Sequence, residues 1–258
     1  MLGAIAGDVI GSVYEFDNQR TKDFPLFRED TTFTDDTILS VAVADVLLHG
    51  GDYGTAFKRY YRRYPNPSGG YGARFAQWAA SARSEPYNSW GNGAAMRVSP
   101  VGFAFGDLET VLKEAERTAI VTHDHPEGIK GAQTTAAAVF LCRTGTSKAD
   151  LKTYIEATFG YDLSRSLEAI RPTYRFDESC QGTVPEAMIA FLESTDFEDA
   201  IRNAVSLGGD SDTLTCITGG IAEAFYGTVP EAIAQEVLNR LAPHLQHIAE
   251  EFQAKYRA

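Results

Sequence analysis

The hydrophobic positions along this chain recur mostly at the spacing of an α-helix, and alternating strand patterns are scarce. This periodicity predicts helices as the main elements. PNPSGGYG at 65–72 interrupts the pattern and predicts a loop. TVPEA, at 183–187 and again at 228–232, predicts two helix starts, because Pro and Glu suit a first turn. Helices are expected over 2–16, 35–49, 53–64, 108–120, 129–142, 148–158, 185–193, 197–206, 213–226 and 230–256.

The first predicted helix carries two patterns of its own. Gly3, Gly7 and Gly11 lie four residues apart and share one face, where they would let another helix approach closely. Asp8 and Glu15 are seven residues apart and would also share a face, and close packing does not explain these acids. No linker or low-complexity segment divides the chain, so we expect a single all-α domain over residues 1–258.

Two acidic clusters of similar construction each precede an apolar helix that is predicted to be buried. The first is FTDDT at 33–37, and the second is GGDSDT at 208–213. Adjacent acids at one helix start can simply stabilise the helix by interacting with its macrodipole, by about 0.3–1 kcal/mol each. Brought together, the two clusters would instead offer four carboxylates and several hydroxyls, which suit one or two hard divalent cations. Because neither motif contains Cys or His, Mg²⁺ or Mn²⁺ fits better than Zn²⁺.

Two further stretches carry candidate ligand-binding groups. In WGNGAAMRVSP at 90–100, glycines flank Asn92, and backbone N–H groups in such a loop can hold phosphate oxygens, although most GxG sequences are ordinary turns. VTHDHP at 121–126 has two histidines with no third metal ligand at useful spacing. We expect His123 to position a ligand by hydrogen bonding and His125 to lie in a surface loop.

Composition narrows the class of protein. A net charge of −12 disfavours tight, non-specific nucleic-acid binding, which needs a Lys/Arg surface. Three widely spaced cysteines without a CxxC pair indicate neither a disulfide framework nor a structural zinc site, and they favour the reducing cytoplasm. Cys142 and Cys216 lie in apolar runs and are expected in the core. The N-terminal segment lacks a basic region and includes Asp8, so no signal peptide is expected, and no stretch is apolar enough to cross a membrane.

Together these motifs resemble the ADP-ribosylglycohydrolase family, which includes the dinitrogenase-reductase-activating glycohydrolases. GAIAGDVIGSVYE at 3–15 is similar to the family's opening helix with its acidic end. FTDDT resembles the family's first metal motif and GGDSDT its second. GNGAAMR at 91–97 resembles the glycine-rich ligand loop, and the pair at 122–123 the family's histidine position. The motifs occur in the family's order and cover most of the chain.

The resemblance implies a compact, orthogonally packed all-α fold with a dinuclear Mg²⁺ or Mn²⁺ centre. It implies that Asp212 bridges both cations and that Glu15 reaches or gates the centre. The implied metal ligands are Thr34, Asp35, Asp36, Asp210, Asp212 and Thr213. The implied substrate contacts, along the diphosphate and the ribose or adenosine, are Gly91, Asn92, Gly93, Met96 and His123.

The activity implied by the resemblance is cleavage of the glycosidic bond at the anomeric carbon of an ADP-ribose conjugate, with release of ADP-ribose. The cations would fix the distal ribose and activate a water, and Asp36 or Glu15 would transfer the proton. The expected partner is an ADP-ribosylated protein, linked for instance through arginine or serine, or a small ADP-ribosyl compound. We expect a cytoplasmic monomer that binds no membrane, and no nucleic acid except as an ADP-ribosylated substrate.

Three alternatives stand beside this interpretation. DSDTLT also resembles the nucleophile motif of haloacid-dehalogenase-type phosphatases, but that motif needs an apolar strand before it, and here Gly208 and Gly209 precede it. A dimetal phosphohydrolase acting on a nucleotide would use the same clusters. A non-catalytic ADP-ribose-binding protein on this scaffold would be favoured by lost metal ligands, whereas this chain keeps acids in both motifs.

Overall fold

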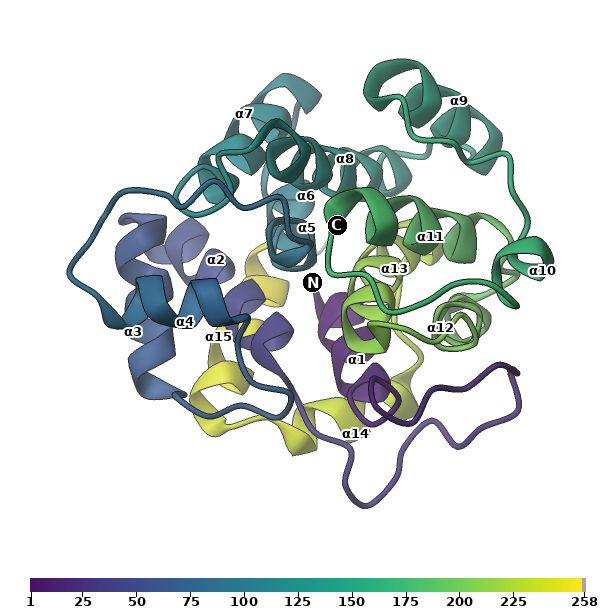
Figure 1. Ribbon diagram of the computed structural model, residues 1–258, viewed down its shortest axis with the longest axis horizontal. Coiled ribbons are helices and arrows are strands. Elements are labelled where there is room, and N and C mark those ends of the chain that lie inside the picture. Colours follow the sequence, from purple (N-terminus) through teal and green to yellow (C-terminus); the bar gives the residue numbers. More distant parts are fainter. Residues whose placement is uncertain (257–258) are drawn as a thin grey trace.

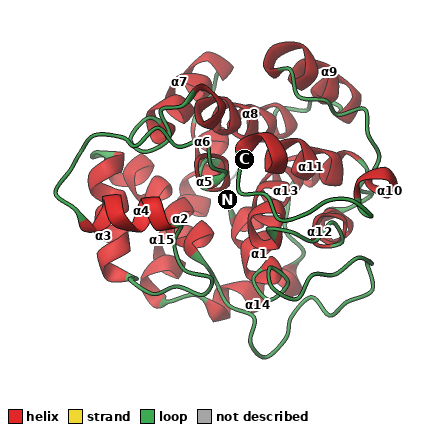
Figure 2. Ribbon diagram, viewed as in Figure 1, coloured by secondary structure: helices red, strands yellow, loops and turns green. Residues whose placement is uncertain are grey.

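The computed structural model describes residues 1–256, and within that range every regular element is a helix (Figure 1, Figure 2). The predicted all-α fold is confirmed, and no strand precedes the DSDT motif in the described chain, as a dehalogenase-type motif would require. None of the helices in residues 1–256 combines the length and the apolar character needed to cross a bilayer. The helices are α1 (Leu2–Gly11), α2 (Asp35–His49), α3 (Tyr53–Arg63), α4 (Ala73–Ala80), α5 (Gly93–Met96), α6 (Ser99–Ala104), α7 (Leu108–Ala119), α8 (Pro126–Arg143), α9 (Lys148–Phe159), α10 (Leu167–Ile170), α11 (Cys180–Leu192), α12 (Phe197–Val205), α13 (Ser211–Tyr226), α14 (Glu231–Arg240) and α15 (Pro243–Tyr256).

The glycine face predicted in the first helix packs against α13 near the middle of the molecule (Figure 1). A Cβ added to Gly3 would overlap the main chain of Gly219, and one added to Gly11 would overlap Ser211 and Asp212. Early residues of α1 therefore meet late residues of α13, so the two helices run antiparallel. This arrangement places the end of α1 beside the second acidic cluster, at the start of α13.

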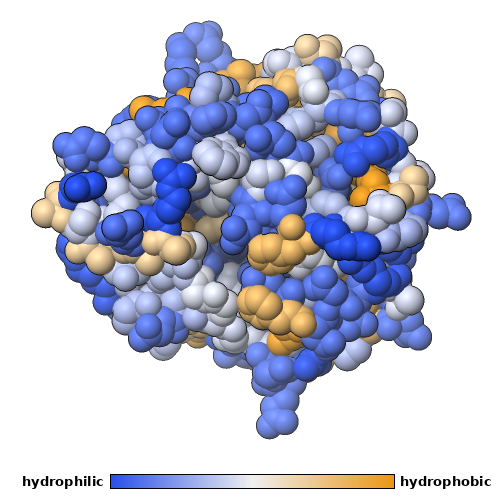
Figure 3. Space-filling model, in the orientation of Figure 1, coloured by the Kyte–Doolittle hydropathy of each residue, from blue (hydrophilic) through white to orange (hydrophobic). Residues whose placement is uncertain are grey.

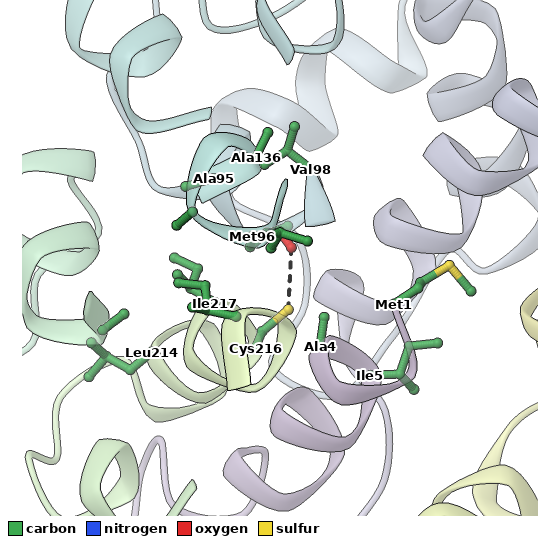
Figure 4. Close-up of a cluster of buried hydrophobic side chains, with 14 of the residues drawn as sticks. Met1, Ala4, Ile5, Ala95, Met96, Val98, Ala136, Leu214, Cys216 and Ile217 are labelled. Atoms are coloured by element: carbon green, nitrogen blue, oxygen red, sulfur yellow. Dashed lines mark hydrogen bonds between the residues drawn. The ribbon is translucent and has the colours of Figure 1, made fainter. Parts of the chain in front are cut away.

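The core beneath the glycine-rich loop is built from several helices. Figure 4 shows side chains from α1, α5, α8 and α13 meeting there, among them Ala4, Met96 and Ile217. The Cys216 thiol donates to the Met96 carbonyl oxygen at 3.3 Å and ties α5 to α13. All three cysteines are free and buried, which confirms Cys142 and Cys216 as core residues. The loop before α5 therefore rests on a packed base.

The first helix is shorter than its periodicity predicts. It ends at Gly11, and the backbone N–H of Ser12 closes it on the Asp8 carbonyl oxygen at 2.9 Å. Glu15 consequently lies in the turn after the helix. The expectation that Asp8 and Glu15 share a helical face is therefore wrong, and the two acids have different roles.

Other helix boundaries also differ from the sequence predictions. Helix α11 begins at Cys180, so Pro185 lies inside the helix and not in its first turn. Ser179 caps α11 and accepts from the Gly182 N–H at 3.1 Å. The second TVPEA agrees better with prediction, because Pro230 immediately precedes α14. The single helix expected over 230–256 is two, α14 and α15, and the short helices α4, α5, α6 and α10 lie outside the ranges predicted as helices.

Candidate active site

A pocket of about 430 Å³ lies where the starts of α2 and α13 meet the glycine-rich loop before α5. Residues 69–75 and the loop before α11 supply further walls. The space-filling view in Figure 3 shows the surface hollowed near the centre of this face, with both hydrophilic surface and orange hydrophobic patches around the hollow. Among the residues predicted as site residues, all except Thr34 line the pocket: Glu15, Asp35, Asp36, Gly91, Asn92, Gly93, Met96, His123, Asp210, Asp212 and Thr213.

The carboxylate side of the pocket, defined here as Glu15, Asp35, Asp36, Asp210 and Asp212, joins both acidic clusters. Carboxylate oxygens of Glu15, Asp210 and Asp212 lie within 4.8 Å of one another. The Thr213 hydroxyl lies 3.5 Å from Asp36 Oδ1, which links the second cluster directly to the first. Helix starts that are far apart in sequence thus meet in space.

Asn18 holds Glu15 beside the second cluster, and sequence reasoning missed it. Its Nδ2 donates to the Glu15 carbonyl oxygen at 2.7 Å and to the Gly209 carbonyl oxygen at 3.2 Å. Its Oδ1 accepts from the Gly209 N–H at 2.8 Å. Gly208 and Gly209 have φ of 64° and 76°, a left-handed conformation that disfavours residues with a Cβ. The glycine pair therefore lets the chain turn sharply and present Asp210 to the pocket.

Asp8 anchors the first acidic cluster and was not predicted as a site residue. It is fully buried, and its carboxylate accepts from the backbone N–H groups of Thr34 and Thr37 at 3.0 and 3.1 Å. It also accepts from both threonine hydroxyls, at 2.6 Å for Thr34. One side chain of α1 thus fixes the start of α2. The only sequence signal for this role was an acid that packing could not explain.

Thr34 caps α2, and its hydroxyl is engaged with neighbours. Its Oγ1 donates to Asp8 and accepts from the Asp36 N–H at 3.2 Å. Because Thr34 does not line the pocket, its assignment as a metal ligand stays a prediction.

Burial and mutual repulsion raise the pKa values of these acids. The pKa values of Asp35 and Asp36 are held well above the ordinary range. Loss of solvent is the largest cause, and the negative charge of Asp8 is the second. For Asp212 and Glu15, loss of solvent is again the largest cause, and the charge of Asp210 is the second. Together they hold the pKa of Asp212 well above its ordinary range and raise the pKa of Glu15 to about 7. In the described part of the chain, no lysine or arginine forms an ion pair with any residue of the carboxylate side.

This donor set fits hard divalent cations. Asp36 Oδ2 is buried and has no hydrogen-bond partner among residues 1–256. An unpaired buried polar atom costs about 1–3 kcal/mol, and more when it is charged. The other groups are carboxylate and hydroxyl oxygens, which Mg²⁺ and Mn²⁺ prefer. A cation here would relieve both the repulsion and the unpaired oxygen.

Asn92 connects the glycine-rich loop to the carboxylate side. Its Nδ2 donates to Asp210 Oδ2 at 2.6 Å and to Thr183 Oγ1 at 3.0 Å. The side chain is buried, and its hydrogen bond orients Asp210 at the pocket wall.

The backbone of the same loop offers fewer free donors than its sequence suggests. The Gly91 N–H donates to Ser89 Oγ at 3.1 Å, and the Asn92 N–H donates to the Glu178 carbonyl oxygen at 2.7 Å. Within residues 1–256, the Gly93 N–H makes no hydrogen bond outside its own short helix and stays available to a ligand.

The histidine side of the pocket, defined here as Arg74, Tyr87, Arg97 and His123, has a different electrostatic character. His123 is buried, and its Nδ1 lies 2.7 Å from Thr122 Oγ1. Burial, followed by the positive charges of Arg97 and Arg74, holds the pKa of His123 well below its ordinary value. The imidazole is therefore neutral near pH 7. His125 lies in the loop between α7 and α8, as expected; it is half-buried and caps α8 by accepting from the Glu127 N–H at 3.1 Å.

Several wall residues carried little or no sequence signal. Arg97 ends the GNGAAMR motif, yet no residue pattern distinguishes it as a site residue. Arg74, Tyr87 and Phe176 lie in or beside irregular segments without hydrophobic periodicity. The Arg74 guanidinium lies 5.1 Å from the centre of the Tyr87 ring, and Phe176 is 49% exposed on the pocket wall. Only the fold brings these side chains to the site.

Comparison with known proteins identifies what this architecture resembles. A family model described as ADP-ribosylglycohydrolase matches residues 1–258. The human ADP-ribosylhydrolase ARH3 is 25% identical over 319 residues, covering 91% of this chain and 87% of that protein. The ADP-ribosylarginine hydrolase Tri1 of Pseudomonas putida is 25% identical over 284 residues, covering 97% of this chain and 76% of that protein.

A solved structure shares the fold. It is described as an ADP-ribosylglycohydrolase-related protein complex and superimposes with a TM-score of 0.73 at 25% sequence identity. The match covers 98% of this chain and 96% of that one. Sequence and structure thus point to the same group of proteins.

Proposed function

This chain belongs to the ADP-ribosylglycohydrolase family, and we propose that it is a divalent-cation-dependent hydrolase that releases ADP-ribose from conjugates by cleaving the bond at the anomeric carbon. The observation that carries the proposal is the meeting of the two acidic clusters, through Asp36 and Thr213, in the pocket that also holds the glycine-rich loop. One pocket thereby offers cation ligands beside groups suited to a diphosphate and a ribose.

The cations would be two Mg²⁺ or Mn²⁺, held by oxygens of Asp35, Asp36, Asp210, Asp212 and Thr213, with Thr34 and Glu15 as further candidates. Bound there, they would supply a positive charge that orients ribose hydroxyls and makes a water more acidic. The Gly93 N–H and His123 would orient the remainder of the ligand by hydrogen bonds. Such fixed orientation lowers the barrier by reducing the freedom of the reacting groups.

Proton transfer is assigned to Glu15 or Asp36, which both line the pocket. Glu15 lies in a turn and is partly exposed, so it can approach a substrate, whereas Asp36 is buried at the start of α2. Glu15→Gln and Asp36→Asn distinguish them. The variant that removes the proton-transfer residue should lose turnover and keep its affinity for the cation. A variant that removes only a metal ligand should lose both turnover and cation affinity.

The test is a panel of defined conjugates, assayed with Mg²⁺, with Mn²⁺ and with chelator. ADP-ribosyl-arginine belongs in it because the name of the relative Tri1 specifies that linkage, and ADP-ribosyl-serine and a small ADP-ribosyl ester provide other linkages. Plain ADP-ribose is the control for phosphate chemistry. Release of ADP-ribose that stops with chelator supports the proposal. Release of AMP would identify a phosphohydrolase, and binding without turnover under every metal would identify a binding protein.

A further inference from the structure

The hydrogen bonds around Thr122 determine which way its hydroxyl points. The fully buried Arg97 has Nη2 at 2.8 Å from Thr122 Oγ1 and at 2.9 Å from the Thr118 carbonyl oxygen. A guanidinium has donors and no acceptor. Thr122 Oγ1 therefore accepts from Arg97, and its single hydrogen remains for another partner.

That partner is His123 Nδ1, which lies 2.7 Å from Thr122 Oγ1. If Nδ1 carried a hydrogen, it would donate to the hydroxyl, and the Thr122 hydrogen would have to turn to the Tyr87 hydroxyl, the competing acceptor on the pocket wall. With Nδ1 as the acceptor, both groups are satisfied. A neutral imidazole that accepts at Nδ1 carries its hydrogen at Nε2.

The Nε2 edge of the ring faces the glycine-rich loop. A Cβ added to Gly93 would lie 3.3 Å from Nε2, and one added to Gly91 would lie 3.6 Å from it. Nε2 has no protein partner in the described part of the chain, and His123 lines the pocket. The backbone N–H of His123 donates to the Ala119 carbonyl oxygen at 2.7 Å and holds the residue at the end of α7.

We propose that Arg97 and Thr122 are positioning residues that lock His123 as a permanent Nε2–H donor toward an oxygen atom of the bound ligand beside the glycine-rich loop. The oxygen is an acceptor-only or hydroxyl oxygen, as found in a diphosphate or a ribose. His123 then binds and orients, and it transfers no proton. The identity of this ligand rests on the proposed function, whereas the tautomer does not.

The tautomer is tested directly by nitrogen-15 NMR of the imidazoles in the ligand-free protein. The chain has 5 histidines, and His123→Gln assigns the His123 signals by their loss. We expect a neutral ring with hydrogen at Nε2. Thr122→Ser should keep that tautomer, and Thr122→Val, which removes the hydroxyl, should shift the ring toward the other form. Hydrogen at Nδ1 in the unaltered protein, or no change in Thr122→Val, overturns the proposal.

Tyr87 provides the matched control for the alternative acceptor. Its ring centre lies 6.0 Å from that of His123, and its phenol oxygen can accept from the Thr122 hydroxyl. Tyr87→Phe should leave the His123 tautomer unchanged. A switch of the ring to Nδ1–H in Tyr87→Phe would show that Tyr87, and not Thr122, sets the tautomer.

The consequence for binding is measured with ADP-ribose by calorimetry and, where a conjugate is turned over, by steady-state kinetics. Thr122→Val and His123→Ala should each weaken binding roughly tenfold, as expected for one hydrogen bond to a polar or charged oxygen. Thr122→Ser and His123→Gln, which keep a hydroxyl and an N–H donor, should recover most of it. Equal loss in His123→Ala and His123→Gln, confined to kcat, would indicate proton transfer by His123 and overturn the proposal. Absence of turnover with every conjugate would instead count against the proposed function and leave the NMR result standing.

Discussion

The two sides of the pocket respond to burial in opposite ways. On the carboxylate side, burial and like charges raise the pKa of Asp212, and Asp36 Oδ2 is left without a partner. On the histidine side, burial and two arginines lower the pKa of His123, and Thr122 connects Arg97 to His123 by hydrogen bonds, while Arg97 Nε and Nη1 have no partner within residues 1–256. The first side lacks a positive charge, whereas the second already carries two arginines beside a neutral imidazole. Cation dependence and ligand orientation are thus separable properties of one pocket.

The largest expected effect comes from Asp212→Asn, which removes a negative charge shared with Asp210 and Glu15. We expect kcat to fall by roughly a hundredfold to a thousandfold or more, because electrostatic groups at a reacting centre contribute on this scale. Calorimetric affinity for Mn²⁺ should fall with it. The matched control is Glu109→Gln, because Glu109 forms an exposed surface pair with Lys113. This variant should change neither kcat nor Mn²⁺ affinity. Near-normal activity in Asp212→Asn would remove Asp212 from the centre.

The carboxylate side also depends on the close packing of α1 against α13. Gly7→Val places side-chain atoms where the main chain of Thr215 already lies. We expect the free energy of unfolding to fall by roughly 1–3 kcal/mol, the usual cost of overpacking, and cation affinity to fall as well. Gly106→Ala is the control, since a Cβ at Gly106 meets no atom within 4 Å. Urea unfolding measures the free energy of unfolding of the two variants. Equal stability of Gly7→Val and Gly106→Ala would contradict the packing argument.

Cation binding should reverse a pH dependence of stability. The raised pKa of Glu15 means that the folded state keeps a proton that the unfolded state loses. Without cations, the contribution of Glu15 to stability should therefore be fully present below its ordinary pKa of 4.5 and should be lost as the pH rises toward about 7. At pH 7.5, Mg²⁺ or Mn²⁺ at about 100 times its Kd should raise the Tm by roughly 5–10 °C. Calorimetric scans with and without chelator decide this, and a flat response to cation would refute it.

The smallest effect is expected on the histidine side. His123→Ala should lower kcat/KM by roughly tenfold, mainly through KM, because one orienting hydrogen bond is lost. Mn²⁺ affinity should stay at the level of the unaltered protein. A parallel loss of cation affinity would show that the two sides are coupled and that the separation drawn above is wrong.

Much of the fold followed from local signals. The apolar run after Asp36 predicted α2 with the bounds that the structure shows, because a helix buried on nearly all faces needs a long apolar segment. The stripe of Gly3, Gly7 and Gly11 predicted a close helix partner, and α13 is that partner. Boundaries set by tertiary contacts were missed. The start of α11 is one of them, where the Cys180 N–H pairs with the Trp90 carbonyl oxygen at 2.9 Å.

The sequence by itself determined the all-α class, the two acidic clusters and the glycine-rich loop, because helix periodicity and helix starts are written in neighbouring residues. The tertiary structure alone decided that Asp8 anchors α2, that Asn18 brings Glu15 to the second cluster and that Arg97 reaches Thr122. These contacts join residues that are distant in the chain. Their energies depend on burial and on hydrogen-bond geometry, which no local pattern of residues records.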